Sequence, residues 1–267
     1  MDTLRITSCQ AANADPWVAA VVGYLAERLG QPAAFINQIG WEERDRLLDA
    51  GQMDVGWICG WPYVRKLARP DANLELLAAP VMAAARYLDQ PIYFSDVVVR
   101  RDSPFMTFAD LRGAAWGYNE PGSQSGFNIT RYHLAKLGEN WTFFGHVVQT
   151  GAHQASLREV RAGRLDATAI DSTVLETELE RDPALRDEIR LIGALGPSPI
   201  PPWVVSTHLP EQQRQALRAA LLEAHTHPAG RAALAVGGLA RFAAVIDRDY
   251  DAIREMARFA EHLEPPA

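Results

Sequence analysis

Two serines between two glycines form the part of this sequence best suited to bind an anion. They belong to the run Gly122-Ser123-Gln124-Ser125-Gly126, which lies between strand-like residues 116–118 and a helix-like run over 127–137. The first turn of a helix leaves about four backbone N–H groups without partners, and the peptide dipoles favour negative charge there. Two hydroxyls add donors, and Gly126 would let a ligand approach the backbone closely. The alternative is an ordinary serine N-cap, although one cap needs only one hydroxyl.

The composition is that of a globular protein, and it argues against two classes of protein. Of the 267 residues, 48% are hydrophobic and 22% are charged, and the formal net charge is −7. No Lys/Arg cluster stands out, so we do not expect nucleic acid as a partner, because such proteins need a concentrated basic face. No run approaches the ~18–20 apolar residues that span a bilayer, so we do not expect a membrane-spanning protein.

The sequence leaves the cellular compartment open. Residues 1–6 show neither the basic region nor the apolar region of a secretion signal. Either the protein stays in the cytoplasm, or the chain begins after a removed signal.

Strand-like and helix-like segments alternate along the chain, which predicts an α/β fold with mostly parallel sheets and helices on both faces. The first series has strands at 4–8, 33–39, 54–58 and 74–81 and helices at 16–29, 41–50 and 61–68. After the β-rich segment 91–99, the second has strands at 114–118, 147–148, 167–170 and 190–195 and helices at 125–137, 153–162 and 172–181. A strand at 203–206 and helices at 210–226, 229–236 and 249–262 complete the chain.

Two segments have the character of crossings between two lobes. Segment 91–99 is a long β-rich run, and the proline-rich residues 197–202 lead into the strand at 203–206. We therefore expect two α/β lobes joined by two chain crossings, with lobe I at 1–91 plus 200–267 and lobe II, inserted, at 92–199. Ligands of open α/β sheets lie beyond the carboxyl ends of the strands, so the cleft between the lobes is the expected site.

Four side chains near the ends of predicted strands are candidates for this site, and each has a structural alternative. Trp57 could line the site or only pack, and Tyr93 could reach the ligand or belong to the core. His153 begins a helix, so its ring could point to the same anion as the serines or to solvent. Asp171 could cap the helix that starts near Ser172, or accept a proton from a protonated oxyanion. Sulfate has no such proton, so a carboxylate facing it would repel it.

The two cysteines, Cys9 and Cys59, follow the first and third strands and are too few for a disulfide framework. In a 2-1-3 strand order these strands are neighbours, so we expect the two sulfurs to lie close together at the rim of the cleft. The alternative is that both are buried free thiols.

Six motifs follow one another in order over about residues 4–206. They are Asp54-Val-Gly-Trp-x-Cys-Gly-x-Pro-Tyr63, Tyr93-x-Ser-Asp-Val-Val-Val99 with Asp102-Ser103, Asp110-Leu-Arg-Gly113, Gly122-Ser-Gln-Ser-Gly126, Gly151-Ala-His153 with Ser156, and Gly163-Arg-Leu-Asp166. As an ordered set they resemble the phosphate/phosphite/phosphonate solute-binding proteins of ABC importers, which have a type II periplasmic-binding fold. The family loop usually carries a small hydroxyl residue where Gln124 stands here.

The resemblance implies roles for residues of both lobes. Ser123, Ser125 and Gly126 would hold the oxygens of the anion, with Gln124 in the same turn. The other expected ligand-binding residues are His153 and Tyr93 as donors, Asp171 as the acidic partner, Trp57 and Tyr63 as the lobe I wall, and Cys9 and Cys59 at the rim.

The function that the resemblance implies is capture of a small phosphorus oxyanion by closure of two lobes, followed by delivery to an ABC permease. It further implies a periplasmic location, and we expect a monomer. We expect no catalytic residue, cofactor or metal, because no nucleophile elbow, Walker-type loop or Cys/His metal spacing appears. Two alternatives stay open: an enzyme of the same fold that binds a pyrimidine or thiamine precursor, and a cytoplasmic ligand sensor.

Overall fold

Helix α1 (Asp15–Leu29) shows how the sequence pattern produces local structure. Val18, Val21 and Leu25 recur at helical spacing and are buried, while Pro16 occupies the first turn. Gly30 ends the helix in the left-handed conformation, with φ of 61°, which glycine adopts without strain. The helix packs on strands β1 (Leu4–Ser8) and β2 (Ala33–Ile36).

The computed structural model describes residues 2–264, and the chain divides into two units. Unit 1 comprises Met1–Ile92 and Pro199–Asp251, and unit 2 comprises Tyr93–Ser198 and Ala252–Ala267. The sequence-based division into lobe I at 1–91 plus 200–267 and lobe II at 92–199 stays a prediction. In the two units of the structure, the chain passes from one unit to the other three times.

The six-stranded sheet of unit 1 is mixed rather than mostly parallel. Its order is β11-β4-β10-β3-β1-β2, in which β2, β1 and β3 are parallel and have the expected 2-1-3 order. Strand β10, which follows the proline-rich crossing segment, pairs antiparallel with β3 on one side and with β4 on the other. Strand β11 pairs antiparallel with β4. The remaining elements of this unit are α2 (Trp41–Asp49), β3 (Val55–Trp57), α3 (Gly60–Leu67), β4 (Leu74–Met82), β10 (Trp203–Ser206), α8 (Glu211–Glu223), α9 (Pro228–Val236) and β11 (Leu239–Ala243).

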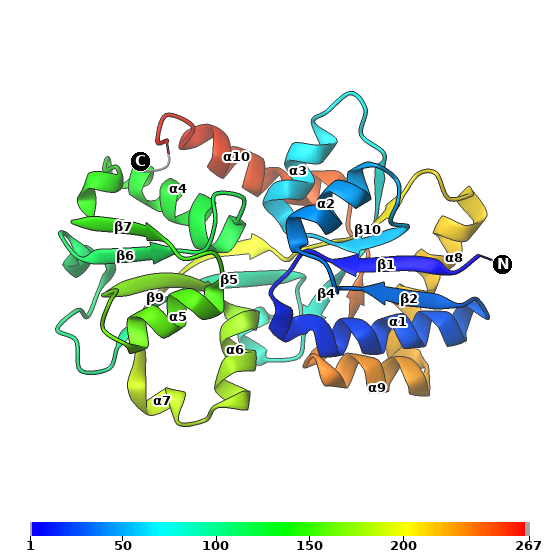
Figure 1. Ribbon diagram of the computed structural model, residues 1–267, viewed down its shortest axis with the longest axis horizontal. Helices are drawn as coiled ribbons and strands as arrows, with labels where there is room; N and C mark the ends of the chain where they lie inside the picture. The colour runs from blue at the N-terminus through cyan, green and yellow to red at the C-terminus, as the bar shows by residue number, and fades with distance from the viewer. Residues whose placement is uncertain (1, 265–267) are drawn as a thin grey trace. The chain divides into compact units, whose positions relative to one another are not determined.

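Helices cover both faces of this sheet. Figure 1 shows α1 and α9 on one side and α2 and α3 on the other. Between α1, α8, α9 and the strands lies a core that includes Trp17, Trp57 and Trp203. Strand β11 was not expected from the sequence.

The sheet of unit 2 has the order β7-β6-β8-β5-β9 and its own separate core. Strands β7, β6 and β8 are parallel, and β5 runs antiparallel to β8. The core is aromatic, with Trp116 stacked on Phe144 at 4.7 Å between ring centroids. The elements are β5 (Ile92–Arg100), β6 (Ala115–Tyr118), a π-helical turn (Gln124–Asn128), α4 (Ile129–Lys136), β7 (His146–Gln149), α5 (His153–Arg161), β8 (Ala167–Asp171), α6 (Ser172–Arg181), α7 (Leu185–Glu188), β9 (Ile189–Pro199) and α10 (Asp251–Phe259).

Helix α10 and the residues after it explain the third crossing. The helix begins at Asp251, the last residue of unit 1, and Leu263 beyond its end is buried in the core of unit 2. Met256 packs against the same core. The periodicity of this segment indicates an amphipathic helix, but it cannot indicate which core its apolar face will join.

Candidate functional site

The carboxyl ends of three parallel strands meet at one edge of the unit 2 sheet. Strand β6 lies between β7 and β8, so Tyr118, Gln149 and Asp171 end their strands at this edge. Ser95 of β5 pairs with Asp171, which brings the start of β5 to the same edge. The π-helical turn packs against β8. Ligands of open α/β sheets bind at such an edge, so it is the candidate site of this unit.

We use the name serine turn for residues 122–126, in which Ser123 is the N-cap of the helical segment. Its Oγ accepts a hydrogen bond from the N–H of Gly126 at 3.0 Å. The N–H of Asn128 donates to the Ser123 carbonyl at 2.9 Å, so the segment starts as a π-helix and continues as α4. The cap occupies only one first-turn amide, and the Ser123 hydroxyl keeps its own hydrogen to donate. Capping and anion binding are therefore compatible here.

Gly126 is packed against Asn119, a residue that the sequence analysis missed. A Cβ at position 126 would overlap Asn119 Oδ1 and lie 3.3 Å from His153 Cε1, whereas a Cβ at Gly122 would meet nothing within 4 Å. Position 126 therefore has no room for a side chain, whereas position 122 does. Asn119 directly follows β6, and a polar residue at the end of a parallel strand is the signal that could have identified it.

His153 begins α5 and is buried, so its ring does not face solvent. Its Nε2 lies 3.0 Å from Ser125 Oγ. Burial lowers the pKa of His153 to about 4, so the imidazole is neutral at neutral pH. With the ring hydrogen on Nε2, the imidazole donates to Ser125, and the Ser125 hydroxyl can donate onward to a ligand.

Two buried polar atoms beside the serine turn have no hydrogen-bond partner among the described residues. They are Asn119 Oδ1 and His153 Nδ1. A buried polar atom left unsatisfied costs about 1–3 kcal/mol, so both atoms would gain from contact with a water or a ligand group. Asn119 Oδ1 is an acceptor, and so is His153 Nδ1 in the tautomer that donates to Ser125. The site therefore combines donors with acceptors.

The loop that follows β7 is tied to the loop that follows β6. The N–H of Thr150 donates to the Tyr118 carbonyl at 2.8 Å, and the N–H of Gly151 donates to the Asn119 carbonyl at 2.8 Å. Thr150 Oγ1 lies 3.0 Å from the same Tyr118 oxygen and 2.6 Å from Ser156 Oγ. These bonds hold the start of α5, and with it the imidazole, next to the serine turn.

Gln124 is completely buried and uses its side chain within unit 2. Its Nε2 lies 3.2 Å from Ser198 Oγ, and its Oε1 accepts from Asn128 Nδ2 at 2.7 Å. Both ends of the amide have protein partners, which argues against the direct ligand contact expected from its place in the turn.

Asp171 is the N-cap of α6, as its structural alternative predicts. Its Oδ1 accepts from the N–H of Thr173 at 2.8 Å and from the Thr173 hydroxyl at 2.7 Å. Burial raises the pKa of Asp171 to about 6, and the hydrogen bonds from Thr173 offset only part of that effect. The carboxyl group can therefore exchange a proton near neutral pH. Tyr93, the first residue of unit 2, is buried near the start of β5.

In unit 1, the two aromatic residues expected to form a ligand wall lie in the protein interior. Trp57 donates from Nε1 to the Pro201 carbonyl at 2.9 Å and packs against Trp17 with 4.5 Å between ring centroids. Tyr63 donates its hydroxyl to Asp247 at 2.8 Å and packs against a second tyrosine. Both side chains therefore have clear packing roles, and a role of either in ligand binding stays a prediction.

Cys9 and Cys59 lie near the carboxyl ends of β1 and β3, which are neighbours, as expected. Ser8 pairs with Trp57, and the N–H of Cys9 donates to the Trp57 carbonyl at 2.9 Å. The two cysteines form no disulfide, and both are partly exposed rather than buried. Close approach of the two sulfurs stays a prediction.

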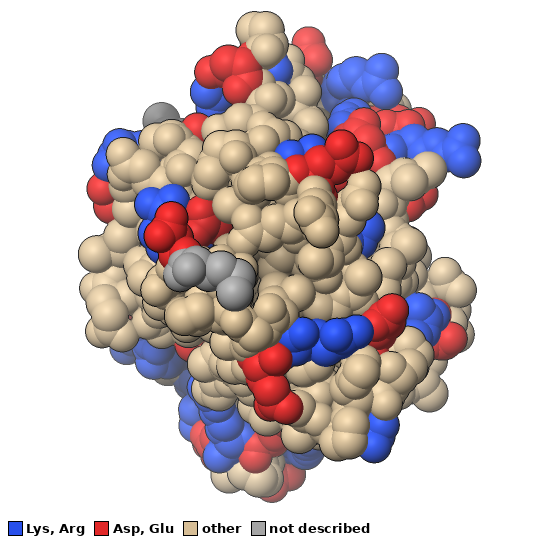
Figure 2. Space-filling view, turned by 90° about the vertical axis from the view of Figure 1, so that its right-hand side faces the viewer, with Lys and Arg blue, Asp and Glu red and all other residues tan. Residues whose placement is uncertain are grey.

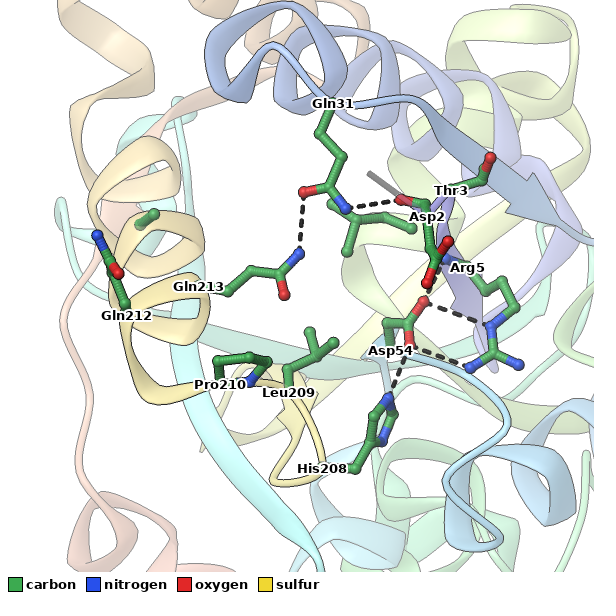
Figure 3. Close-up of a pocket in the computed structure, with 12 residues that line it drawn as sticks. Asp2, Thr3, Arg5, Gln31, Asp54, His208, Leu209, Pro210, Gln212 and Gln213 are labelled. Atoms are coloured by element: carbon green, nitrogen blue, oxygen red, sulfur yellow. Dashed lines mark hydrogen bonds and ion pairs between the residues drawn. The ribbon is translucent and has the colours of Figure 1, made fainter.

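A pocket of about 750 Å³ opens at the amino ends of the parallel strands of unit 1 (Figure 3). Asp54 in this pocket accepts from the Arg5 N–H at 2.6 Å, from Arg5 Nη2 at 3.1 Å and from His208 Nε2 at 2.9 Å. Burial would raise the pKa of Asp54, but the hydrogen bonds from Arg5 and His208 outweigh it and lower that pKa. Gln213 donates to Gln31 across the same pocket. These polar groups pair with one another at the edge opposite Cys9 and Cys59.

Charged groups on the face that Figure 2 presents are of mixed sign, with Lys and Arg beside Asp and Glu rather than gathered in one basic field. The ion pairs of the chain include Arg28 with Glu223 and Arg69 with Asp71. Among residues 2–264, no helix is both long and apolar enough to cross a membrane. The same residues contain no group of three or more His, Cys, Asp or Glu side chains placed to hold a metal ion.

Several solved structures share this fold across nearly the whole chain. A binding-protein component of an ABC phosphonate transporter from Pseudomonas aeruginosa superposes with a TM-score of 0.84 at 17% identity, covering 97% of this chain and 86% of that one. PhnD1 from Prochlorococcus marinus, solved with methylphosphonate, gives 0.83 at 19% identity, covering 98% and 99%. The aliphatic sulphonate binding protein SsuA from Escherichia coli gives 0.61 at 17% identity, covering 98% and 87%. These likenesses confirm the type II periplasmic-binding fold.

A family model covers most of the chain. It describes the periplasmic substrate-binding protein of phosphonate ABC transporters, and it matches residues 10–250. The match includes the serine turn, His153 and Asp171. The partner that such a family implies is an ABC permease, with a small ligand as cargo. This chain belongs to the family of periplasmic substrate-binding proteins of phosphonate ABC transporters.

Proposed function

We propose that this protein captures a small phosphorus oxyanion, such as phosphate, phosphite or a phosphonate, and delivers it to an ABC permease. The anion would be held at the serine turn, and we further propose that unit 1 closes over it, as hinge-closing binding proteins do. The observation that carries the proposal is the donor set at the start of the helical segment. There Ser123 is the cap and Ser125 contacts a buried neutral imidazole. Hydroxyls and helix-terminal amides can replace the water shell of an oxyanion.

The acceptors at the same edge favour an oxyanion that carries a proton. Asn119 Oδ1 and His153 Nδ1 are unsatisfied acceptors in the tautomer that donates to Ser125. Asp171 is the last residue of β8, the strand against which the π-helical turn packs. A phosphonate monoanion has an O–H to donate, whereas sulfate has none. PhnD1 was solved with methylphosphonate and SsuA is named for sulphonates, so one fold serves both chemistries. Selectivity must then come from side chains such as Asp171.

We also propose that the anion is bound without being turned over. The Ser125–His153 contact has the spacing of a nucleophile and its base. A working triad needs a third group that orients the imidazole through its other nitrogen. His153 Nδ1 has no such partner among residues 2–264.

Isothermal titration calorimetry of the purified protein tests the proposed ligand class. The panel is phosphate, phosphite, methylphosphonate, aminoethylphosphonate, sulfate and methanesulfonate. We expect at least one phosphorus compound to bind and sulfate to bind at least about tenfold more weakly, which is ~1.4 kcal/mol. Phosphorus NMR of the incubated ligand should show it unchanged. Binding of sulfate or methanesulfonate alone would contradict the proposal, and a converted ligand would contradict binding without turnover.

Asp171→Asn tests whether this carboxyl group excludes sulfate. The asparagine Oδ1 can still cap α6 through Thr173, so the helix should persist, while the negative charge is lost. We expect sulfate affinity to rise about tenfold, because the repulsion is removed, and phosphonate affinity to change less. Asp187→Asn removes one exposed charge from α7 and controls for net charge. Equal sulfate affinity in wild type and Asp171→Asn would rule out this role.

A further inference from the structure

A chain of buried hydrogen bonds connects the serine turn with the C-terminal helix α10. Arg131 Nη2 donates to Asn128 Oδ1 at 2.9 Å, and Asn128 Nδ2 donates to Gln124 Oε1 at 2.7 Å. Gln124 Nε2 then lies 3.2 Å from Ser198 Oγ and 3.2 Å from Met256 Sδ. All of these partners belong to unit 2, and the Gln124 and Asn128 side chains have no exposed surface.

The direction of these bonds is fixed by the donor-only guanidinium at one end. Arg131 cannot accept a hydrogen bond, so Asn128 must turn its oxygen to it and its NH₂ group to Gln124. Gln124 must in turn present its oxygen to Asn128 and its NH₂ group to Ser198 and Met256. Both of those atoms can accept, so every link has a donor facing an acceptor. A buried chain in which each of these links is matched favours one arrangement of its members.

The chain of bonds reaches α10 at two points. Met256 receives the Gln124 amide, and the Ala257 carbonyl lies 3.4 Å from Arg131 Nη2. The ring of Phe259 meets Tyr132 of α4 edge-on, at 5.5 Å between ring centroids. Helix α10 therefore holds the helical segment that begins at the serine turn.

We propose that Gln124, Asn128 and Arg131 form a polar clamp that positions the serine turn for its ligand. Gln124 is a positioning residue in this proposal and not a ligand residue. Its backbone lies between Ser123 and Ser125, so fixing its side chain fixes the peptide groups on both sides. The effect of the clamp on affinity rests on the proposed function, because it concerns the same turn.

Gln124→Met is the direct test, because methionine has a similar length and volume but neither donates nor accepts as an amide does. We expect the dissociation constant for methylphosphonate, or for whichever phosphorus oxyanion the wild type binds, to rise about tenfold or more. We also expect the Gly126 amide, which donates to Ser123, to exchange with solvent faster. Gln212→Met makes the same change on an exposed position of α8 in unit 1 and should alter neither quantity.

A pair of variants at Arg131 separates positioning from a general loss of stability. Arg131→Lys keeps a cation that can donate to Asn128, and Arg131→Met does not. We expect the lysine variant to bind closer to wild type than the methionine variant, with the Gly126 exchange rate in the same order. Met256→Leu is the substitute test if Gln124→Met does not fold, because it keeps the packing and removes only the sulfur acceptor. It should raise the dissociation constant and the Gly126 exchange rate, each by less than Gln124→Met would.

Two outcomes distinguish failure of the clamp from failure of the proposed function. If the wild type binds none of the phosphorus oxyanions, the proposed function fails, while Gly126 exchange in the same variants still decides the clamp. If the wild type binds, and Gln124→Met and Arg131→Met match it in affinity and in Gly126 exchange, the clamp is overturned.

Discussion

At the scale of single residues, the proposed anion site depends on the neutral state of His153. A protonated imidazole would attract almost any anion, whereas a neutral one supplies one donor and one acceptor in fixed directions. Burial imposes the neutral state by lowering the pKa to about 4. Ligand choice then depends on hydrogen-bond geometry rather than on charge alone.

The same burial predicts a stability difference that depends on pH. The pKa of His153 is lower in the folded state than its ordinary value of 6.5, so the unfolded chain binds more protons between pH 6.5 and 4. Its contribution to stability is present above pH 6.5 and is lost as the pH falls toward 4. His153→Gln keeps a nitrogen for Ser125 but cannot be protonated. When the pH is lowered from 7 to 5, the free energy of unfolding should fall in both proteins. The fall should be about 2 kcal/mol larger in wild type than in His153→Gln.

Urea unfolding of both proteins at the two pH values measures this difference. The raised pKa of Asp171 acts in the opposite direction, since protonation of that carboxyl favours the folded state as the pH falls from 6 to 3.8. Because both proteins contain Asp171, the comparison cancels its contribution. An equal fall in wild type and His153→Gln would show that the imidazole is not held neutral by burial.

Part of this site could be predicted from the sequence, and part could not. Ser123, Ser125 and His153 are close in space because each follows the end of a parallel strand, and hydrophobic patterning identifies strand ends. The buried contacts of Gln124 could not be predicted, because its partners Ser198 and Met256 are distant in the sequence. Only the fold brings them together, and no local pattern indicates them.

At the scale of secondary-structure elements, alternation predicted most of the strands and helices. The 2-1-3 strand order assumed for the two cysteines is present in unit 1. Alternation could not predict that the crossing strands run antiparallel within each sheet, because strand direction depends on connectivity. Nor did it find β11, a five-residue strand that follows α9 closely. Local periodicity identifies elements, whereas their pairing depends on the whole chain.

The amino ends of β1 and β3 supply a test at this scale. Asp54→Asn removes the carboxylate that Arg5 and His208 share at this edge of the sheet. We expect a loss of about 2 kcal/mol in the free energy of unfolding at pH 7, because Arg5 and His208 lose the buried carboxylate to which they donate. The stability difference between wild type and Asp54→Asn should shrink once the pH falls below 3.8, the ordinary pKa of an aspartate. It should vanish as the pH passes through the lowered pKa of Asp54, because the wild-type carboxylate is then protonated as well.

Asp2→Asn is the matched control in thermal or urea unfolding, because Asp2 lies in the same pocket and is exposed. Equal stability of Asp54→Asn and Asp2→Asn at pH 7 would show that the Asp54 pairs contribute nothing to this edge of the sheet.

At the scale of the whole molecule, the chain forms two cores and passes between its two units three times. The third passage gives the C-terminal helix to the unit that contains the serine turn, where it meets Gln124 and Arg131. Membership of the phosphonate substrate-binding family agrees with a transport role, and the fold is shared with PhnD1 and SsuA. The fold alone does not specify the ligand, and in the proposed function the side chains at the carboxyl edge of unit 2 select it.

Calorimetric titration of Ser123→Ala/Ser125→Ala beside Gly122→Ala tests the central claim most directly. Both variants change the same turn, but only the first removes hydroxyl donors, and a Cβ at Gly122 enters open space. We predict that Gly122→Ala binds the phosphorus oxyanion as wild type does, and that the double variant binds at least about a hundredfold more weakly, which is ~2.7 kcal/mol. A folded double variant with wild-type affinity would contradict an anion site at the serine turn.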